Sequence, residues 1–519
     1  MALLHLTVYL LLSCLDSLSE ANSTQPRMTI TEKETSIKRI PLPGHHAPVG
    51  IVLERQPDSV IAAGQTHLYA FHFQNPQKTP EEISVLWTEC IDKGAPQRVK
   101  ANCNYNITVV HKKLEDNQVF LCGTNGQETV CCDMEDRGGI KNHLRYSWTS
   151  QMNARLFCGD PDSRQHFSEL VDVATVHADQ WQNTRVYALF RNEWGMSAVC
   201  VYTIQDIENI FTTSTFKGKD NQPGRPRQCV ADSTKIPLDA LKMIIENSEM
   251  EEWVRPVNNS GPLLFNHHSY THIYVDSSQN NHPTVLFLSL NNGGIHKVME
   301  SKSQTFVIAE YRPFNHGAQV LHMVLHASSR KLYVNSRSEL VQLDVANCAQ
   351  YGNSCGDCVL ARDPYCGWNG THCTPGGELQ DVTQGDYSIC VSTSKLQQPG
   401  KAFRYSTDTH ADEAKGSITL PPESKYFLQC PVSSHHAQYT WRHHESNTSC
   451  SSMKQQCLLL IDSMGAEQVG TYTCVSEEKG YSRVLAQYQL RLGSTAVGRS
   501  SSPLVWLCLM AVLIQSVAD

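Results

Sequence analysis

Six cysteines fall within 43 residues, from Cys348 to Cys390, in a stretch rich in Gly, Asp, Pro and Asn. A segment of this length and composition cannot bury enough apolar surface to fold unaided, so it must be cross-linked. It contains the sequence CGDC, from Cys355 to Cys358. By itself this sequence fits a redox motif, half of a zinc site, or two half-cystines of different disulfides. The compartment in which the chain folds decides among the three.

The chain begins like a secreted protein. An apolar run from Ala2 to Leu15 is followed by small residues, and we assign residues 1–21 to a signal peptide, although no Lys or Arg precedes the run. In the oxidising secretory pathway cysteines form disulfides by default. A redox CxxC also needs to lie at the start of a helix, whereas Pro364 and a Gly-Asn turn follow here. We therefore interpret Cys355 and Cys358 as half-cystines.

Other features agree with secretion to the cell surface. After the polar spacer, the apolar tail from Leu504 to Ala518 has no basic stretch behind it, which favours GPI attachment over a short membrane span. Ser494 is the preferred attachment residue, and residues 495–519 form the expected propeptide. Five Asn-x-Ser/Thr sequons predict N-glycosylation, at Asn22, Asn106, Asn258, Asn369 and Asn447.

Charge and motifs argue against several classes of protein. The chain has 43 basic and 51 acidic residues, a net charge of −8, and no long basic run, so we expect no nucleic-acid partner. It contains no GxSxG, HExxH, P-loop or dinucleotide-binding sequence, and its histidine pairs are scattered along the chain. We therefore expect no catalytic residues, no cofactor and no bound metal.

Short apolar and alternating runs recur from Ile51 to Val345, separated by Gly, Asn, Asp and Ser. The sequence LSLNNGGIHKV, from Leu288 to Val298, predicts two strands joined by a tight turn. Repeated hairpins over this length indicate a sandwich array or a propeller. The only helix expected lies near residues 238–253.

A different pattern appears after a polar linker at residues 397–416. Within residues 417–492, Trp441 follows Cys430 by eleven positions, and Tyr472 precedes Cys474 by two. This spacing is typical of an immunoglobulin-like (Ig-like) sandwich of the C2 type, with a disulfide from Cys430 to Cys474 between its sheets. A second disulfide, Cys450–Cys457, is expected to close a local loop.

Family-specific sequences narrow these alternatives. The segment from Cys348 to Cys390, with CGDC and RDPYCGW, closely resembles the PSI module of plexins, semaphorins and integrins. The order of the segments also resembles the GPI-anchored class of the semaphorin family. Upstream stretches similar to the sema domain are CNYN at Cys103, FLCGTNGQETVC at Phe120, ARLFC at Ala154, HFSELVDV at His166, SAVCVYTIQDI at Ser197, GRPRQCV at Gly224 and LFLSLNNGGIHKV at Leu286.

The resemblance implies a mainly β chain. Residues 45–346 would form a sema-type β-propeller, seven-bladed in the family, and residues 347–392 a small disulfide-knotted PSI module ahead of the Ig-like C2 β-sandwich. It also implies a cell-surface ligand that is held by a GPI anchor and is shed as well. Such a ligand would bind a C-type plexin and β1 integrin, and it would form homodimers through the sema domain. The implied roles are in axon growth and guidance, neurogenesis, cell migration and immune-cell activation. No Arg-Gly-Asp occurs in the chain, so an integrin contact through that tripeptide is not expected.

The sema region is shorter than the resemblance predicts. Ile51 to Val345 spans 295 positions, whereas a sema domain of the family takes about 500 residues in seven blades. The discontinuity lies near residues 140–146, and roughly two blades are expected to be absent. The alternative to a signalling ligand is therefore a truncated isoform that acts as a non-signalling or decoy binding protein.

The resemblance also suggests disulfide partners. Within the PSI module it suggests Cys348–Cys366, Cys355–Cys390 and Cys358–Cys373. In the sema region Cys90–Cys103 and Cys122–Cys131 are expected as local pairs, and Cys158–Cys229 as a long-range pair. Cys132 and Cys200 are left without an assigned partner.

Overall fold

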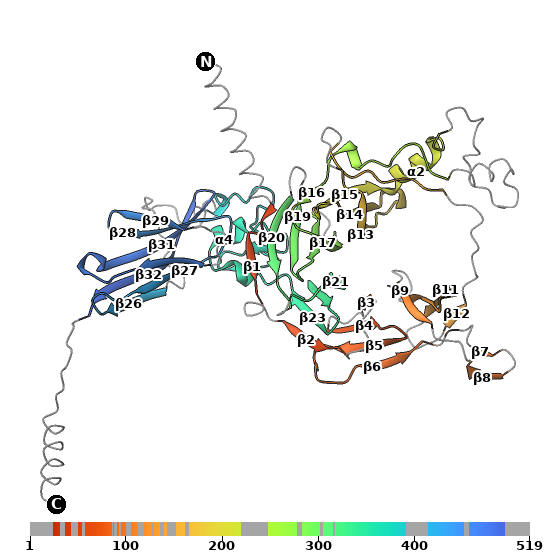
Figure 1. Cartoon of the computed structure of the whole chain (residues 1–519), viewed down its shortest axis with the longest axis horizontal. Coiled ribbons are helices and arrows are strands. Elements are labelled where there is room, and N and C mark those ends of the chain that lie inside the picture. The colour runs from red at the N-terminus through yellow and green to blue at the C-terminus, as the bar shows by residue number, and fades with distance from the viewer. Residues whose placement is uncertain are drawn as a thin grey trace, which may run out of the picture. The chain divides into compact units, whose positions relative to one another are not determined.

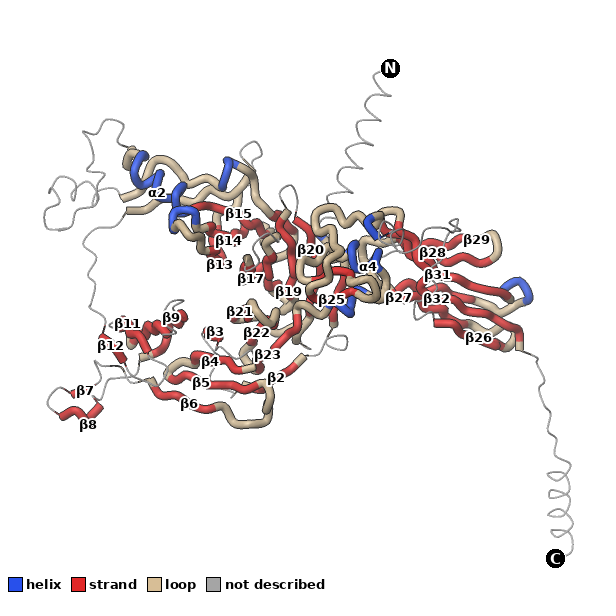
Figure 2. The backbone as a smooth tube through the Cα atoms, turned by 180° about the vertical axis from the view of Figure 1, so that it is seen from behind, coloured by secondary structure: helices blue, strands red, loops and turns tan. Residues whose placement is uncertain are grey.

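We describe the protein from a computed structural model. The structure describes residues 24–31, 37–42, 50–53, 58–85, 87, 91–92, 95–99, 105–112, 119–126, 129–134, 140–142, 152–160, 166–218, 248–277, 283–301, 305–314, 317–390, 414–450 and 456–493. The chain divides into two compact units, residues 1–401 and 402–519, which are treated separately below. Figures 1 and 2 show that strands dominate both units.

Five sheets of four or five strands form most of the first unit. Within each sheet, strands that follow one another along the chain pair antiparallel. The first two sheets are β3–β6 (Gly50–Leu53, Ser59–Ala63, His67–His72, Glu81–Ser84) and β9–β12 (Asn106–Lys112, Val119–Thr124, Thr129–Met134, Ile140–Asn142). The third is β13–β16 (Glu169–Val176, Arg185–Arg191, Ser197–Thr203, Leu264–Asn266), and a separate short pair is β7–β8 (Ile91–Asp92, Ala95–Val99).

The fourth and fifth sheets each gain a strand from the start of the described chain. Strand β1 (Met28–Ile30) lies parallel to β20, and β2 (Lys38–Pro41) lies antiparallel to β23. The fourth sheet is β17–β20 (Tyr270–Asp276, Val285–Leu290, Ile295–Glu300, Thr305–Tyr311), and the fifth is β21–β23 (His322–His326, Lys331–Asn335, Glu339–Asp344). Strands β20 and β23 are thereby paired on both sides, and the new outer edges are the short strands β1 and β2.

The first strands of successive sheets contact one another in series, β13 with β17, β17 with β21, β21 with β3, and β3 with β9. In Figure 1 the five sheets accordingly follow one another around a common centre. No comparable contact joins β9 to β13 among the described elements. The arrangement is that of propeller blades, and the two sheets at the ends of the series flank the discontinuity expected near residues 140–146.

Nearly continuous apolar runs explain why a central strand of these sheets is covered on both faces. All six residues of β18 are buried, because both of its faces are covered. The turn after it contains Gly293 with φ +86°, where a Cβ atom would lie 2.2 Å from the carbonyl oxygen of Ala318. The hairpin predicted from Asn-Gly is therefore present, and Gly293 is needed for both its backbone angle and its close contact.

The helix predicted near residues 238–253 is not present in the described part of that range. Residues 248–253 form bridges and bends, and residues 238–247 lie outside the described residues. The structure instead has α2 (Ile204–Thr213), which directly follows Thr203. The Thr203 hydroxyl accepts a hydrogen bond from the Asp206 backbone N–H at 3.1 Å, so Thr203 is a helix N-cap. The short 3-10 turns η2 (Trp181–Asn183) and η4 (Val257–Asn259) complete this part.

The PSI module follows β23 directly. It consists of η5 (Cys348–Tyr351), the helix α4 (Cys355–Leu360) and the strands β24 (Cys366–Trp368) and β25 (Cys373–Pro375). A helix therefore does begin at CGDC, contrary to the expectation from sequence. Ser354 caps its first turn, and its hydroxyl accepts from the Asp357 N–H at 3.1 Å.

The second unit is a sandwich of a five-stranded and a two-stranded sheet. Its strands are β26 (Ala414–Leu420), β27 (Tyr426–Pro431), β28 (Gln438–His443), β29 (Ser446–Cys450), β30 (Gln456–Ile461), β31 (Gly470–Glu478) and β32 (Tyr481–Leu492), with η6 (Ala466–Gln468) before β31. The sheet orders are β26-β32-β31-β28-β29 and β27-β30. Strand β26 begins at Ala414, inside the segment predicted as a linker.

Candidate functional site: the joint between propeller and PSI module and the disulfide framework

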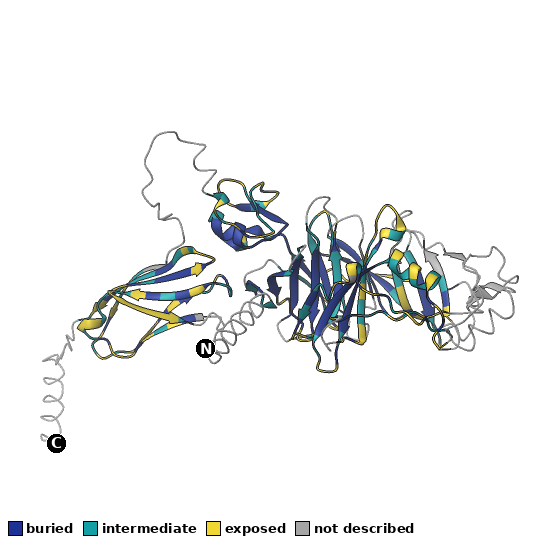
Figure 3. Ribbon diagram, turned by 90° about the horizontal axis from the view of Figure 1, so that it is seen from above, coloured by how far each residue is buried: buried dark blue, intermediate teal, exposed yellow. Residues whose placement is uncertain are grey.

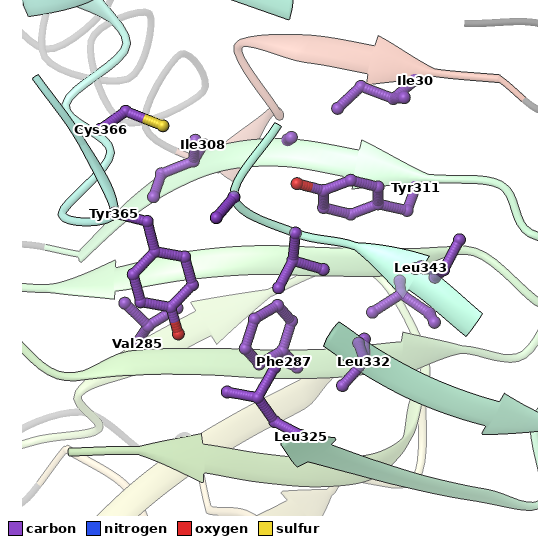
Figure 4. Packing of buried hydrophobic residues seen from close by; sticks show 14 of the residues in the cluster. Ile30, Val285, Phe287, Ile308, Tyr311, Leu325, Leu332, Leu343, Tyr365 and Cys366 are labelled. Atoms are coloured by element: carbon purple, nitrogen blue, oxygen red, sulfur yellow. The ribbon is translucent and has the colours of Figure 1, made fainter. Parts of the chain in front are cut away.

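The PSI module shares one hydrophobic core with the last two sheets of the propeller. Phe287 of β18, Leu332 of β22 and Tyr365 of the PSI module belong to the same cluster of buried side chains, which Figure 4 shows gathered among the strands. Figure 3 shows the corresponding sheets as largely buried. Burying one such large apolar side chain contributes about 1.5–3 kcal/mol, so a cluster of this size holds the module firmly to the propeller.

A buried ion pair lies in the same joint. The Lys297 ammonium on β19 donates to both carboxylate oxygens of Asp363, at 2.7 and 2.6 Å, and to the carbonyl oxygen of Val345 at 2.8 Å. Both charged side chains have no exposed surface. The Tyr351 hydroxyl donates to the same carboxylate at 2.6 Å. Burial lowers the pKa of Lys297, and the Asp363 carboxylate acts in the opposite direction.

A second polar contact crosses the joint. The Tyr365 hydroxyl of the PSI module donates to the Asp276 carboxylate at 2.5 Å, and the Arg330 guanidinium of the β21–β22 turn pairs with the same carboxylate. The guanidinium also lies 4.5 Å from the centre of the Tyr365 ring. Burial, followed by the negative charge of Asp276, raises the pKa of the Tyr365 hydroxyl. These directional contacts fix the orientation of the module, which apolar packing alone would not do.

The disulfides of the PSI module form the pattern that the resemblance suggested. Cys348 is joined to Cys366, Cys355 to Cys390 and Cys358 to Cys373, with Cα–Cα distances of 5.6, 5.9 and 5.6 Å. The two cysteines of CGDC therefore bond to different partners. The Trp368 side chain packs against this core, and Asn369 next to it is exposed.

In the sema region the structure contains one of the predicted disulfides and contradicts another. Cys122 is joined to Cys131 across β10 and β11. Cys158 is joined to Cys200, at a Cα–Cα distance of 5.8 Å, so the predicted Cys158–Cys229 pair is wrong. The reason is packing: Cys200 lies on β15 on the face buried against the segment that carries Cys158, and both residues belong to one buried cluster. Cys229, Cys90 and Cys103 lie outside the described residues, as does the side chain of Cys132.

In the Ig-like module Cys430 is joined to Cys474 and Cys450 to Cys457. Trp441 lies opposite Cys474 in the sheet and is buried in the core that contains both disulfides. The Tyr472 hydroxyl donates to the Gln468 side chain at 2.7 Å, where a tyrosine corner usually bonds to backbone. Among the described residues, the three-cysteine cluster of Cys430, Cys457 and Cys474 is the one grouping with metal-ligand spacing, and all three sulfurs are already in disulfides.

The four predicted glycosylation sites within the described residues, Asn106, Asn258, Asn369 and Asn447, are all exposed. The Asn369 side-chain oxygen accepts from the Thr371 hydroxyl at 3.0 Å within its sequon. Asn22 and Ser494 lie outside the described residues. No helix of the described residues is long and apolar enough to cross a membrane.

Two of the described sheets each expose more than one large apolar side chain. Leu170 and Val173 on β13 are 49% and 42% exposed, on the sheet that ends the propeller series. The sequence did not identify this exposed face, because the apolar periodicity of β13 is the same as that of strands whose faces are covered. On the Ig-like module Phe427, Leu458 and Leu460 project from the outer face of the β27–β30 sheet. Such side chains are typical of protein-contact surfaces.

Three family matches follow the order of the modules. The Sema domain matches residues 170–327, the Plexin repeat residues 347–398, and the immunoglobulin-like domain of semaphorins 3, 4 and 7A residues 413–502. The Sema match begins at β13, so the sheets β3–β6 and β9–β12 lie outside it.

Similar proteins were found by sequence and by structure. Semaphorin-7A from Homo sapiens is 34% identical over 371 residues, which cover 68% of this chain and 54% of that protein. Semaphorin-4D from Mus musculus is 29% identical over 68% of this chain and 44% of its own length. The chain thus spans about half the length of these curated relatives. The solved structure of Drosophila Semaphorin 2a aligns with a TM-score of 0.62 at 15% identity, over 91% of this chain and 99% of that one.

A second solved structure, Drosophila Plexin A in complex with Semaphorin 1b, aligns with a TM-score of 0.52 at 17% identity, over 71% of this chain and 99% of the matched chain. At these identities the two structural likenesses show the fold alone. The three family matches, in the order in which the modules follow along the chain, and the identity to Semaphorin-7A carry the assignment. This chain belongs to the semaphorin family.

Proposed function

We propose that this chain is a GPI-anchored cell-surface semaphorin that binds a plexin of the C type. The observation that carries the proposal is the order of sema sheets, PSI module and Ig-like module in one chain. The likeness to Semaphorin-7A supports the anchored class, and the solved complex of Plexin A with Semaphorin 1b supports a plexin as partner. The proposed roles are in axon growth and guidance, cell migration and immune-cell activation.

The buried contacts between the propeller and the PSI module are consistent with such a ligand. Receptor signalling requires that the binding surface is presented in a fixed orientation, and the Lys297–Asp363 and Asp276–Tyr365 contacts hold the PSI module to the propeller in one position. An interface of standard size, about 1,600 Å², would supply the binding energy without any reactive group.

The binding test uses the chain on the surface of transfected cells and the soluble ectodomain of a C-type plexin. We expect saturable binding at or below micromolar plexin, and absence of binding at that concentration contradicts the proposal. The variants Trp181→Ala and Trp194→Ala serve as probes of the surface. Their side chains are 57% and 74% exposed, so their loss leaves the fold intact.

Release of the chain by phosphatidylinositol-specific phospholipase C tests the anchor, and retention after that treatment contradicts it.

β1 integrin and a second copy of the chain are proposed as further partners, on the resemblance alone. The integrin contact must use residues other than Arg-Gly-Asp, since the sequence lacks that tripeptide. Cell adhesion blocked by an antibody against the β1 subunit, and the molar mass of the ectodomain in solution, test these two partners separately.

A second function, that of a non-signalling binding protein, is favoured by one specific observation. The described residues form five blade-like sheets, and no contact comparable to those between neighbouring sheets joins the first and last of the series. A chain that binds plexin but does not change the shape of plexin-expressing cells would have this second function. Binding together with a shape change supports the first.

A further inference from the structure

The two disulfides of the Ig-like module lie side by side. The sulfur atoms of Cys430, Cys457 and Cys474 all lie within 4.8 Å of one another, although Cys457 is bonded to Cys450 and the other two are bonded together. Cys430 and Cys457 are also direct partners in the antiparallel pair of β27 and β30. Two disulfides at this distance can exchange partners when one sulfur is released as a thiolate.

The burial of the four cysteines determines which sulfur is released. Cys430, Cys457 and Cys474 are at most 1% exposed, whereas Cys450 at the end of β29 is partly exposed. We therefore expect an external thiolate to attack the Cys450 sulfur before the other three. Attack at that sulfur makes Cys457 the leaving group, and Cys457 is the cysteine that adjoins the core disulfide.

We propose that the Ig-like module is a thiol–disulfide exchange site, in which an external dithiol reduces Cys450–Cys457 and the released Cys457 thiolate then attacks Cys430. In the first step the dithiol forms a mixed disulfide with Cys450, and the electron pair of the broken bond stays on Cys457. In the second step a Cys430–Cys457 bond forms, the Cys430–Cys474 bond breaks, and Cys474 leaves as a thiolate that takes up a proton.

The second thiol of the dithiol then displaces Cys450 from the mixed disulfide, which leaves Cys450 as a thiol and the dithiol as a cyclic disulfide. The balance is two disulfides and one dithiol giving one protein disulfide, two protein thiols and one oxidised dithiol. Residues directly opposite on antiparallel strands have Cα atoms about 4.5–5.5 Å apart, which a disulfide can bridge. This geometry makes Cys430, rather than Cys474, the expected partner of Cys457.

The exchange changes how the sandwich is cross-linked. The bonds Cys430–Cys474 and Cys450–Cys457 both join the two-stranded sheet to the five-stranded sheet. The new Cys430–Cys457 bond lies within the two-stranded sheet, so no disulfide between described residues then joins the two sheets. The expected result is a module that opens more readily, with its buried face accessible to proteases.

The test treats the full chain under native conditions with limiting dithiothreitol, alkylates free thiols with iodoacetamide, and maps the linkages by mass spectrometry. Digestion with trypsin and Asp-N separates the four cysteines, since cleavage after Arg442 and Lys454 and before Asp462 gives each its own peptide. We expect a linked Cys430–Cys457 pair with Cys450 and Cys474 alkylated. An intact Cys430–Cys474 pair with Cys450 and Cys457 alkylated overturns the proposal, and so does a linked Cys457–Cys474 pair.

Two variants test the same step without a reductant. Cys450→Ser leaves Cys457 as a thiol from the start, and we expect the Cys430–Cys457 pair in a substantial fraction of the protein. Cys457→Ser, the matched control, leaves the thiol on Cys450 and should keep only Cys430–Cys474. Identical maps for both variants, with only the core bond present, count against the exchange. If Cys450→Ser is not secreted, the reduction of the unmodified chain still decides the question.

Discussion

At the scale of single residues, the Lys297–Asp363 pair is a fully buried ion pair between the propeller and the PSI module. An isolated buried charge is costly, whereas a paired and hydrogen-bonded one is tolerated. Each charge here has its partner, and the Asp363 carboxylate has two further donors, the Tyr351 hydroxyl and the Tyr365 backbone N–H. Removing only one partner should therefore be far more damaging than neutralising both.

We predict that Lys297→Met lowers the free energy of unfolding of the first unit by about 3–5 kcal/mol, because Asp363 is left buried without its counter-charge. The double variant Lys297→Met, Asp363→Asn should recover a large part of this loss, since the amide is neutral and still accepts from Tyr351. Urea unfolding followed by fluorescence measures both. Equal losses for the single and the double variant would show that the charge itself is not what matters.

A second residue-scale prediction concerns His296, which is fully buried on β19. Its Nδ1 lies 2.7 Å from the Tyr270 hydroxyl, its ring 5.3 Å from that of His268, and its Nε2 3.9 Å from the Glu310 carboxylate. Burial, together with the positive potential of His268 and Arg312, lowers the pKa of His296 to about 3. The imidazole therefore stays neutral in the folded protein.

The sign of the pH dependence follows from this pKa. The unfolded chain takes up a proton at His296 below about pH 6.5 and the folded chain does not, so stability is lost as the pH falls from 6.5 towards 3. Between pH 7 and pH 5 the contribution is about 2 kcal/mol. His296→Gln should lose this part of the pH dependence in urea unfolding at the two pH values. The same slope in both proteins would mean that His296 does not titrate in this way.

At the scale of elements, the PSI knot depends on one close backbone contact. A Cβ atom at Gly367 on β24 would lie 2.0 Å from the carbonyl oxygen of Gly377, and the neighbouring disulfides prevent the backbone from moving away. Gly370, three residues on, has φ +102° but open space where its Cβ would be. At Gly367 a side chain is excluded by lack of space, whereas at Gly370 it is disfavoured only by the backbone angle.

We predict that Gly367→Ala abolishes secretion of correctly bonded protein, whereas Gly370→Ala costs only about 1–2 kcal/mol of backbone strain. Secreted yield and peptide mapping of the three PSI disulfides measure the difference. A normal yield and correct pairing for Gly367→Ala would indicate that β24 and the Gly377 segment can separate.

Elements with a strong local signal could be predicted from the sequence, and those set by tertiary packing could not. The Asn-Gly hairpin and the Cys-Trp-Tyr-Cys pattern of the Ig-like module have fixed local spacing, so both were identified. Helix α2 was missed although Thr203 and Asp206 provide a capping signal, because the strand before it reads as one continuous apolar run. The Cys158–Cys200 pair was missed because it joins segments 42 positions apart whose proximity depends on the fold.

At the scale of the whole first unit, the series of sheets ends in two different exposed faces. In a closed propeller every sheet is covered on both sides by its neighbours. Here Leu170 and Val173 of β13, at one end of the series, and Val109 of β9, at the other, are exposed. In the shortened sema region expected from the sequence, these are the faces next to the predicted discontinuity near residues 140–146.

The last prediction tests whether the β13 face is uncovered in solution. Val173 on β13 is 42% exposed, whereas Leu189 on the neighbouring strand β14 is fully buried between two sheets. Val173→Lys should therefore change the free energy of unfolding by no more than about 0.5 kcal/mol, and Leu189→Lys should lower it by several kcal/mol. Urea unfolding of the two variants gives the comparison, because both introduce a lysine and both positions lie in the same sheet. A loss above about 2 kcal/mol for Val173→Lys would mean that another surface covers β13, because burying an unpaired ammonium is what makes such a substitution costly.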